Sequence, residues 1–147
     1  MNEKYTIKKH GYYIEELEVG QNVIFSKTIA EVDIKKFSEL SGDKNPVHLD
    51  NKFAEKTIFK KRIAHGFLTA SFISAAIGTK LPGPGCIYLK QSLKFLGPVY
   101  PGDNISTKIT VKKIDLARKR VTLETDCFCN EKKILEGEAE ILVASKK

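Results

Sequence analysis

The sequence predicts a single α+β domain in which an antiparallel sheet wraps around one long buried helix. A chain of 147 residues leaves room for one domain with a real core, here spanning 1–147, with residues 1–14 as a polar N-terminal extension. Segment 66–79 has no charged residue and is apolar nearly all round, which indicates a buried helix. After residue 85, apolar residues recur at every second position, which is typical of strands joined by short turns.

The first half of the chain is expected to contain one strand and two short helices. A strand is predicted over 22–29, and a helix over 30–40 that Gly42 closes. The apolar stripe expected on this helix consists of Val32, Ile34, Phe37 and Leu40. Asp50 can cap a second short helix, which carries Phe53 and Ala54.

The second half is expected to form a meandering antiparallel sheet. The long helix ends at the turn-rich segment 81–85. The next run places four apolar residues on one face: Ile87, Leu89, Leu93 and Phe95. Three later runs repeat the alternation over 105–111, 121–127 and 134–144. An exposed edge of such a sheet is a natural place for two subunits to pair.

The composition narrows the classes of function. The 25 Lys and Arg residues exceed the 18 Asp and Glu residues, so the net charge is +7 and the surface attracts anions. Nucleic acid, anionic lipid and a phosphorylated cofactor such as coenzyme A all qualify as partners. The sequence has no basic helix and no aromatic-rich ribonucleoprotein motif, so we expect no nucleic-acid partner. It also has no uncharged apolar run of about 18 residues and no secretion signal, so we expect no membrane partner and a cytoplasmic location.

The cysteines are expected to be reduced and structural. The three residues Cys86, Cys127 and Cys129 cannot all pair within one chain. They lack the Cys-x-x-Cys spacing of zinc sites and have no histidine at ligand spacing beside them. We therefore expect no metal site and reduced thiols in a cytoplasmic protein.

The segment from Ser41 to His48 is the most unusual part of the sequence. Pro46 biases the residue before it away from helical geometry, so a shaped loop is expected. Asp43 and His48 lie five positions apart, and a bent loop can direct both at one water molecule. A carboxylate and an imidazole that meet there are suited to proton transfer. The alternative is a turn in which Asp43 caps backbone amides and His48 fills space.

A second candidate feature lies at the start of the long helix. The amide of Gly66 can hold an oxygen that becomes negatively charged, although a tight turn required by packing also explains this glycine. His65, immediately before it, is interpreted as structural. Ser74 lies two helical turns beyond Gly66 on nearly the same side. Its hydroxyl is expected to bond a carbonyl four residues earlier, or else to orient the Asp43–His48 loop or a substrate.

These residues resemble a known family. The stretch from Phe37 to Ala54 resembles the hydratase signature of MaoC-like dehydratases, which include the (R)-specific enoyl-CoA hydratases. The matching positions are Phe37, Leu40, Ser41, Gly42, Asp43, Asn45, Pro46, Val47, His48 and Ala54. The resemblance continues through 64–66, Ser74 and the segments up to Asp103. The sequence departs from the pattern at Asn51, where proline is common, and at the variable position Lys44.

The resemblance implies a hot-dog fold, a homodimer and the reversible hydration of a trans-2-enoyl-CoA to an (R)-3-hydroxyacyl-CoA. It also implies that Asp43 and His48 hold the catalytic water, that the Gly66 amide binds the thioester carbonyl, and that Ser74 supports the site. It requires no metal, flavin or nicotinamide cofactor, because coenzyme A is part of the substrate. The alternatives are an acyl-CoA thioesterase or an acyl-carrier-protein dehydratase on the same fold, and a non-catalytic acyl-ligand binding module.

Overall fold

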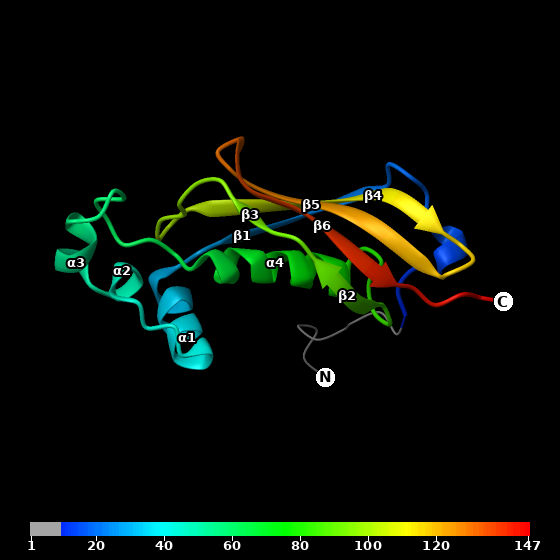
Figure 1. The fold of residues 1–147 in the computed structure, drawn as a ribbon, viewed down its shortest axis with the longest axis horizontal. Coiled ribbons are helices and arrows are strands. Elements are labelled where there is room, and N and C mark those ends of the chain that lie inside the picture. Colours follow the sequence, from blue (N-terminus) through cyan, green and yellow to red (C-terminus); the bar gives the residue numbers. More distant parts are fainter. Residues whose placement is uncertain (1–9) are drawn as a thin grey trace.

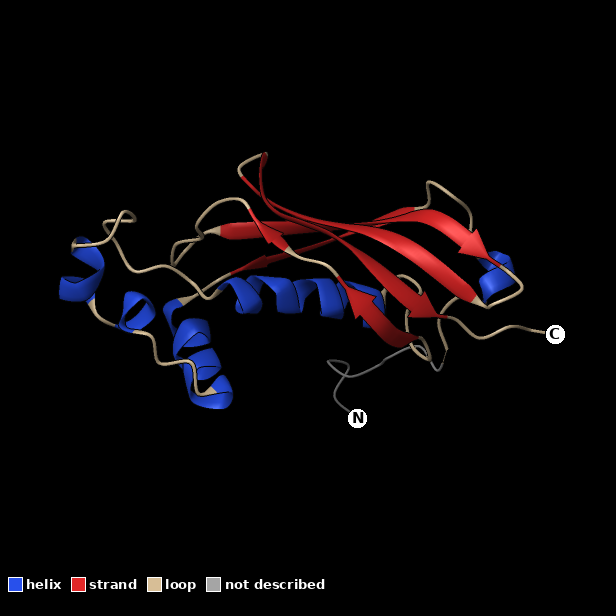
Figure 2. Cartoon of the chain, in the orientation of Figure 1, coloured by secondary structure: helices blue, strands red, loops and turns tan. Residues whose placement is uncertain are grey.

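The computed structural model describes residues 10–147, which form a six-stranded antiparallel sheet packed against one central helix (Figures 1 and 2). The main strand order is β1-β4-β5-β6-β2, and the short β3 pairs with β6. The strands are β1 (Asn22–Thr28), β2 (Ile87–Gln91), β3 (Lys94–Phe95), β4 (Asn104–Asp115), β5 (Arg120–Cys129) and β6 (Lys132–Leu142). The predicted antiparallel sheet wrapped on a helix is confirmed.

The core lies between the sheet and helix α4 (Gly66–Thr79). The sheet and α4 are together called the body. Strands β4 and β5 direct alternate side chains toward α4, as the sequence pattern predicts. These eight residues are all buried: Ile105, Thr107, Ile109, Val111, Val121, Leu123, Thr125 and Cys127. The alternation predicted for the last strand is also confirmed, with Leu135, Ala139 and Ile141 buried.

A second part of the chain, residues 30–63, extends beyond one end of the sheet and is called the overhang (Figure 1). It carries three short helices: α1 (Glu31–Ser41), α2 (Pro46–Leu49) and α3 (Asn51–Glu55). Gly42 ends α1 in a left-handed conformation with φ of 80°, and the Asp50 side chain accepts a hydrogen bond from the Phe53 amide at the start of α3. Both predicted helix boundaries are confirmed.

Two predicted apolar faces differ from the structure. On α1, Val32 and Leu40 are 51% and 88% exposed, because Ile34, Phe37 and the buried Ser38 form the face that packs inward. The run 87–95 is not one strand, since its pairing with β6 shifts between Tyr88 and Lys90 and the chain then breaks before β3. This run lies at the sheet edge, where no described element covers it, so the face predicted to be buried is largely exposed.

Helix α4 is buried on one side only. Its side chains Leu68, Phe72, Ile73 and Ile77 pack toward the sheet. The opposite side carries Phe67, Ser71, Ser74 and Gly78, all of which are exposed. The helix predicted over this uncharged segment is therefore confirmed, but the prediction that it is buried all round is wrong. Most side chains on its exposed side are small or carry a hydroxyl, so the helix can face outward there without charged residues.

The predicted N-terminal extension, residues 1–14, lies partly outside the described residues. Its described end packs against the body: Ile14 is buried in the 3₁₀ helix η2 (Ile14–Glu16), and its amide donates to the carbonyl of Ala144. Within residues 10–147, no helix has the length and apolar character needed to cross a membrane.

Candidate active site

The loop after α1 is shaped by short-range hydrogen bonds. The Asp43 amide donates to Ser41 Oγ at 3.1 Å, and the Asn45 amide donates to Asp43 Oδ1 at 3.2 Å. The Asn45 side chain then accepts from the Val47 amide and so caps α2, which has Pro46 in its first turn. These contacts explain why this sequence produces a bent loop followed at once by a helix that carries His48.

His48 is held at the inner side of α2, where it is 7% exposed. Its Nδ1 lies 2.7 Å from the carbonyl oxygen of Ile63, which can only accept, so Nδ1 carries the hydrogen and donates it. Nε2 is then left with a lone pair. Burial lowers the pKa of His48 below its ordinary value of 6.5, and this effect outweighs the Ile63 hydrogen bond and the Asp43 charge, which raise it. The ring is therefore a neutral proton acceptor at neutral pH.

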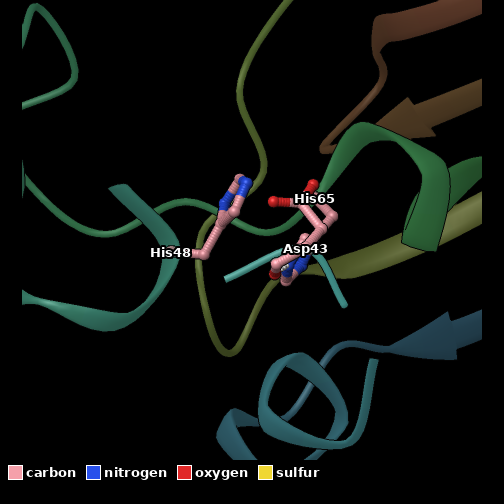
Figure 3. Close-up of side chains that lie close together, drawn as sticks. All are labelled: Asp43, His48 and His65. Atoms are coloured by element: carbon pink, nitrogen blue, oxygen red, sulfur yellow. Dashed lines mark hydrogen bonds between the residues drawn. The ribbon is translucent and has the colours of Figure 1, made fainter. Parts of the chain in front are cut away.

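Asp43, His48 and His65 come together at one place (Figure 3). One ligand-type atom from each side chain lies within 4.8 Å of the others, although the three residues come from a loop, from α2 and from the residue before α4. Asp43 is exposed, whereas both histidines are buried. The predicted convergence of Asp43 and His48 is thus observed, and its alternative reading is partly observed too, since Asp43 also accepts a backbone hydrogen bond.

The two histidine rings of the cluster stack on one another. Their centroids are 3.8 Å apart and the interplanar angle is 28°. One nitrogen of each ring faces a backbone carbonyl oxygen, that of Ile63 for His48 and that of Asp43 for His65. Each ring therefore keeps its second nitrogen free of a backbone partner within the described residues.

A cavity of about 460 Å³ is lined by residues on both sides of His65 in the chain, but by none of the three residues of the cluster. It is lined by Ile63, whose carbonyl accepts the His48 hydrogen bond, and by Gly66, the first residue of α4. Most of its other walls are apolar, including Phe67, Phe95 and Leu96. A Cβ atom at Gly66 would lie 2.6 Å from the Phe95 ring, so this position accepts only glycine without a shift of that ring. The glycine therefore serves close packing and leaves its amide at the cavity wall.

Ser74 lies elsewhere. It is exposed on the open side of α4, and at a rise of about 1.5 Å per residue it stands roughly 12 Å along the helix from Gly66. Among residues 10–147 it forms neither of the two predicted hydrogen bonds, to a carbonyl one turn earlier or to the Asp43–His48 loop. The structure of one chain thus does not bring Ser74 to the cluster.

The cysteines take no part in this site. Burial raises the pKa of the Cys127 thiol to about 11 and also raises the pKa values of Cys86 and Cys129, so all three stay protonated at neutral pH. All three are free, as predicted. Cys127 is buried, whereas Cys129 is only half-buried, because the pairing of β5 with β6 shifts after Cys127.

Comparison with known proteins places the chain in a family. The MaoC like domain family model matches residues 16–130. The (R)-specific enoyl-CoA hydratase of Rhodospirillum rubrum is 47% identical over 135 residues, covering 92% of this chain and 94% of that protein. The 3-hydroxybutyryl-CoA dehydratase of Methylorubrum extorquens is 44% identical, covering 91% of this chain and 85% of that protein.

A solved structure agrees in fold. The unliganded R-hydratase PhaJ1 from Pseudomonas aeruginosa superposes with a TM-score of 0.87 at 46% identity, covering 93% of this chain and 88% of that chain. This similarity extends over both the body and the overhang. With the matched family model and two relatives above 40% identity, it confirms the hot-dog fold, and the chain belongs to the MaoC-like domain family.

Proposed function

We propose that this chain catalyses the reversible hydration of a trans-2-enoyl-CoA to an (R)-3-hydroxyacyl-CoA. Two relatives above 40% identity are an (R)-specific enoyl-CoA hydratase and a 3-hydroxybutyryl-CoA dehydratase, whose names describe the two directions of one type of reaction. The single observation in this chain that carries the proposal is the convergence of Asp43 and His48 at the residue before Gly66, which lines an apolar cavity.

In the proposed reaction, the thioester end of the substrate lies against the start of α4. The Gly66 N–H donates a hydrogen bond to the thioester oxygen, and the positive end of the helix dipole stabilises the negative charge that develops there. This polarisation makes C3 of the enoyl group electrophilic. The acyl chain then occupies the apolar part of the cavity, lined by Phe67, Phe95 and Leu96.

Water addition is assigned to the Asp43–His48 pair. His48 Nε2, left unprotonated by the Nδ1 bond to Ile63, accepts a proton as the water oxygen bonds to C3. The electron pair of the C2–C3 double bond moves toward C2 and the thioester oxygen. C2 then takes a proton from the pair, so that one water molecule is added in total. General acid–base help contributes about 10²–10⁴ in rate, and one oxyanion donor about 10²–10³.

The first experiment follows the loss of the enoyl thioester ultraviolet absorbance on incubation with crotonyl-CoA. Asp43→Asn and His48→Gln are expected to lower kcat by at least about 10²-fold while the circular dichroism spectrum is unchanged. Asp50→Asn is the matched control, because asparagine also caps a helix and Asp50 lies outside the cluster. Full activity of either site variant contradicts the assigned roles.

The same samples distinguish the alternative activities. Release of free thiol from an acyl-CoA without formation of a hydroxyacyl-CoA would identify a thioesterase instead. Formation of the (S) product would contradict the stereochemical part of the proposal. Binding of acyl-CoA without any turnover would identify a non-catalytic module. Turnover restricted to carrier-protein thioesters would identify an acyl-carrier-protein dehydratase.

The proposal includes a homodimer in the cytoplasm and no cofactor beyond the coenzyme A of the substrate. The edge strand β2 exposes Ile87, Tyr88 and Leu89, and on the open side of α4 Phe67 is 65% exposed. Unpaired backbone groups at such an edge favour pairing with a second strand. Free thiols suit a reducing compartment. A monomeric sedimentation coefficient at assay concentration would contradict the dimer.

A further inference from the structure

His65 contacts each of the three elements that carry the proposed chemistry. It is the residue immediately before α4, so it precedes the Gly66 amide in the chain. Its ring stacks on His48 of α2 at 3.8 Å between centroids, and its Nε2 lies 3.0 Å from the main-chain oxygen of Asp43. It is 2% exposed and also packs against Phe37 of α1 at 4.8 Å between centroids.

The hydrogen bonds define the tautomer of this ring. Nε2 faces two oxygens, the main-chain oxygen of Asp43 and Ser38 Oγ, both at 3.0 Å. A carbonyl oxygen can only accept, so Nε2 carries the hydrogen and donates it to Asp43, with the Ser38 hydroxyl close enough to share it. Nδ1 then carries a lone pair instead of a hydrogen. It is buried, and within the described residues it has no hydrogen-bond partner.

Packing alone does not account for a histidine at this position. Phe37 and Ile34 lie on the same inward face of α1, so an apolar ring would fit these surroundings without leaving a buried nitrogen unpaired. What distinguishes the histidine from such a ring is its Nε2–H, which faces the main-chain oxygen of Asp43 and Ser38 Oγ.

The Nε2 bond to Asp43 differs in kind from the others made by Asp43. The bonds to Ser41 Oγ and from the Asn45 amide lie within the loop itself, so they shape the loop but do not place it. Among the described residues, the bond from His65 connects the Asp43 main chain to the start of α4. The position of the carboxylate relative to Gly66 therefore depends on His65.

We propose that His65 is a positioning residue, whose Nε2–H places the Asp43 loop and whose ring supports His48, so that both side chains face the Gly66 amide. The inference rests on the proposed function, since it assigns His65 to the same reaction. His65 itself does not touch the substrate. A displacement of about 1 Å in a catalytic group can cost about 10²-fold in rate, so loss of this placement is a large effect.

Two substitutions separate the two contacts of the ring. His65→Phe keeps a planar ring for stacking but removes the donor, whereas His65→Gln keeps an N–H donor at a similar distance from Cα but removes the ring. We expect His65→Phe to lower kcat about 10–100-fold with KM within threefold. We expect His65→Gln to recover part of that kcat, because it restores the donor but not the ring that stacks on His48. The matched control is His10→Phe, which alters a histidine stacked on Tyr13 outside the site and leaves kcat unchanged.

The pH profile gives a readout that loss of packing alone does not move. The titratable groups that face His48 are Asp43 from the loop and His65 from α4, of which Asp43 raises the pKa of His48 and His65 lowers it. Burial is the largest cause of the lowered pKa of His48 and remains in His65→Phe, whereas the contribution of His65, which also lowers it, is removed. Because His48 must be neutral to accept a proton, the acid limb of kcat is expected below pH 6.5 in the wild type and at higher pH in His65→Phe.

The outcomes separate this inference from the proposed function. If Asp43→Asn remains fully active, the proposed roles of the pair fail. If Asp43→Asn is inactive while His65→Phe matches the wild type in kcat and acid limb, His65 is only structural. If either His65 variant does not fold, nitrogen NMR of the wild-type histidines decides the matter: hydrogen on Nε2 of His65 supports the inference, and hydrogen on Nδ1 overturns it.

Discussion

The body and the overhang are stabilised by different interactions. In the body, β4 and β5 alone bury eight side chains against α4, and their backbones are paired on both sides of one register shift between Val111 and Lys113. The overhang is a longer segment, yet it buries only four: Ile34, Ser38, His48 and Ala54. Two of these four are polar, and both belong to or contact the candidate site.

The overhang is instead held by discrete polar contacts. Arg62 bonds to Glu31 of α1 at 2.6 Å and to Asn51 of α3 at 2.7 Å, and so connects both ends of the segment. Side-chain caps by Asn45 and Asp50 begin α2 and α3. Stability therefore depends mainly on the body, whereas Asp43 and His48 are placed mainly by contacts within the overhang, so substitutions in each part should affect different measurements.

The largest expected effect on stability lies in the body. Leu123 is completely buried in β5 and is paired with Val111 and Ala139 on the two neighbouring strands. Leu123→Ala leaves a cavity there and is expected to lower the free energy of unfolding by about 2–5 kcal/mol, with kcat of the folded protein nearly unchanged. Urea unfolding at one fixed protein concentration measures this change.

The control for Leu123→Ala is the same substitution at Leu116. Leu116 is 62% exposed in the turn between β4 and β5, so its truncation is expected to change the free energy of unfolding by less than about 0.5 kcal/mol. Equal effects at the two positions, or a large loss of kcat in folded Leu123→Ala, would contradict the separation between body and overhang.

The same division explains what the sequence predicted. In β4, β5 and β6, apolar and polar side chains alternate, and the apolar ones face α4. The sequence pattern therefore predicted these strands well. The edge run from Ile87 to Phe95 has similar alternation but no described element covering it. Alternation reports which face is apolar, not whether another element covers it.

The site was predicted only where its contacts are local. Asp43 and His48 lie within one loop and short helix, and Pro46 indicates the bend between them, so their convergence was foreseen. The contact of Ser38 with His65 joins residues 27 positions apart, and sequence spacing gives no sign of it. The one available signal was Ser38 itself, a hydroxyl at the turn after Ile34 on the inward face of α1.

A smaller effect on stability, but a clear one on activity, is expected in the overhang. The Asn45 side chain caps α2, which has only four residues and carries His48. Asn45→Ala is expected to lower kcat about tenfold by freeing His48, while the free energy of unfolding falls by about 1 kcal/mol. Asn45→Ser, which keeps a capping oxygen, should retain most of the activity. Equal losses in both variants would show that the cap is not the cause.

The smallest expected effect is the pH dependence of stability that the overhang contributes. Burial lowers the pKa of His48 in the folded protein, so between that value and 6.5 the unfolded chain binds more protons than the folded one. The free energy of unfolding therefore falls as the pH is lowered through 6.5, and the loss is complete below the folded pKa. His48→Gln removes this contribution, because glutamine does not titrate.

The measurement is the difference in free energy of unfolding between wild type and His48→Gln across pH 5–8. Burial also raises the pKa of Asp126 on β5, but this carboxyl is present in both proteins, so its contribution cancels in the difference. Parallel curves would show that His48 is not desolvated by the fold. Curves that separate only below pH 6.5 would show that His48 makes the free energy of unfolding depend on pH. This pH dependence would then arise in the overhang, at the residue to which the proton transfer is assigned.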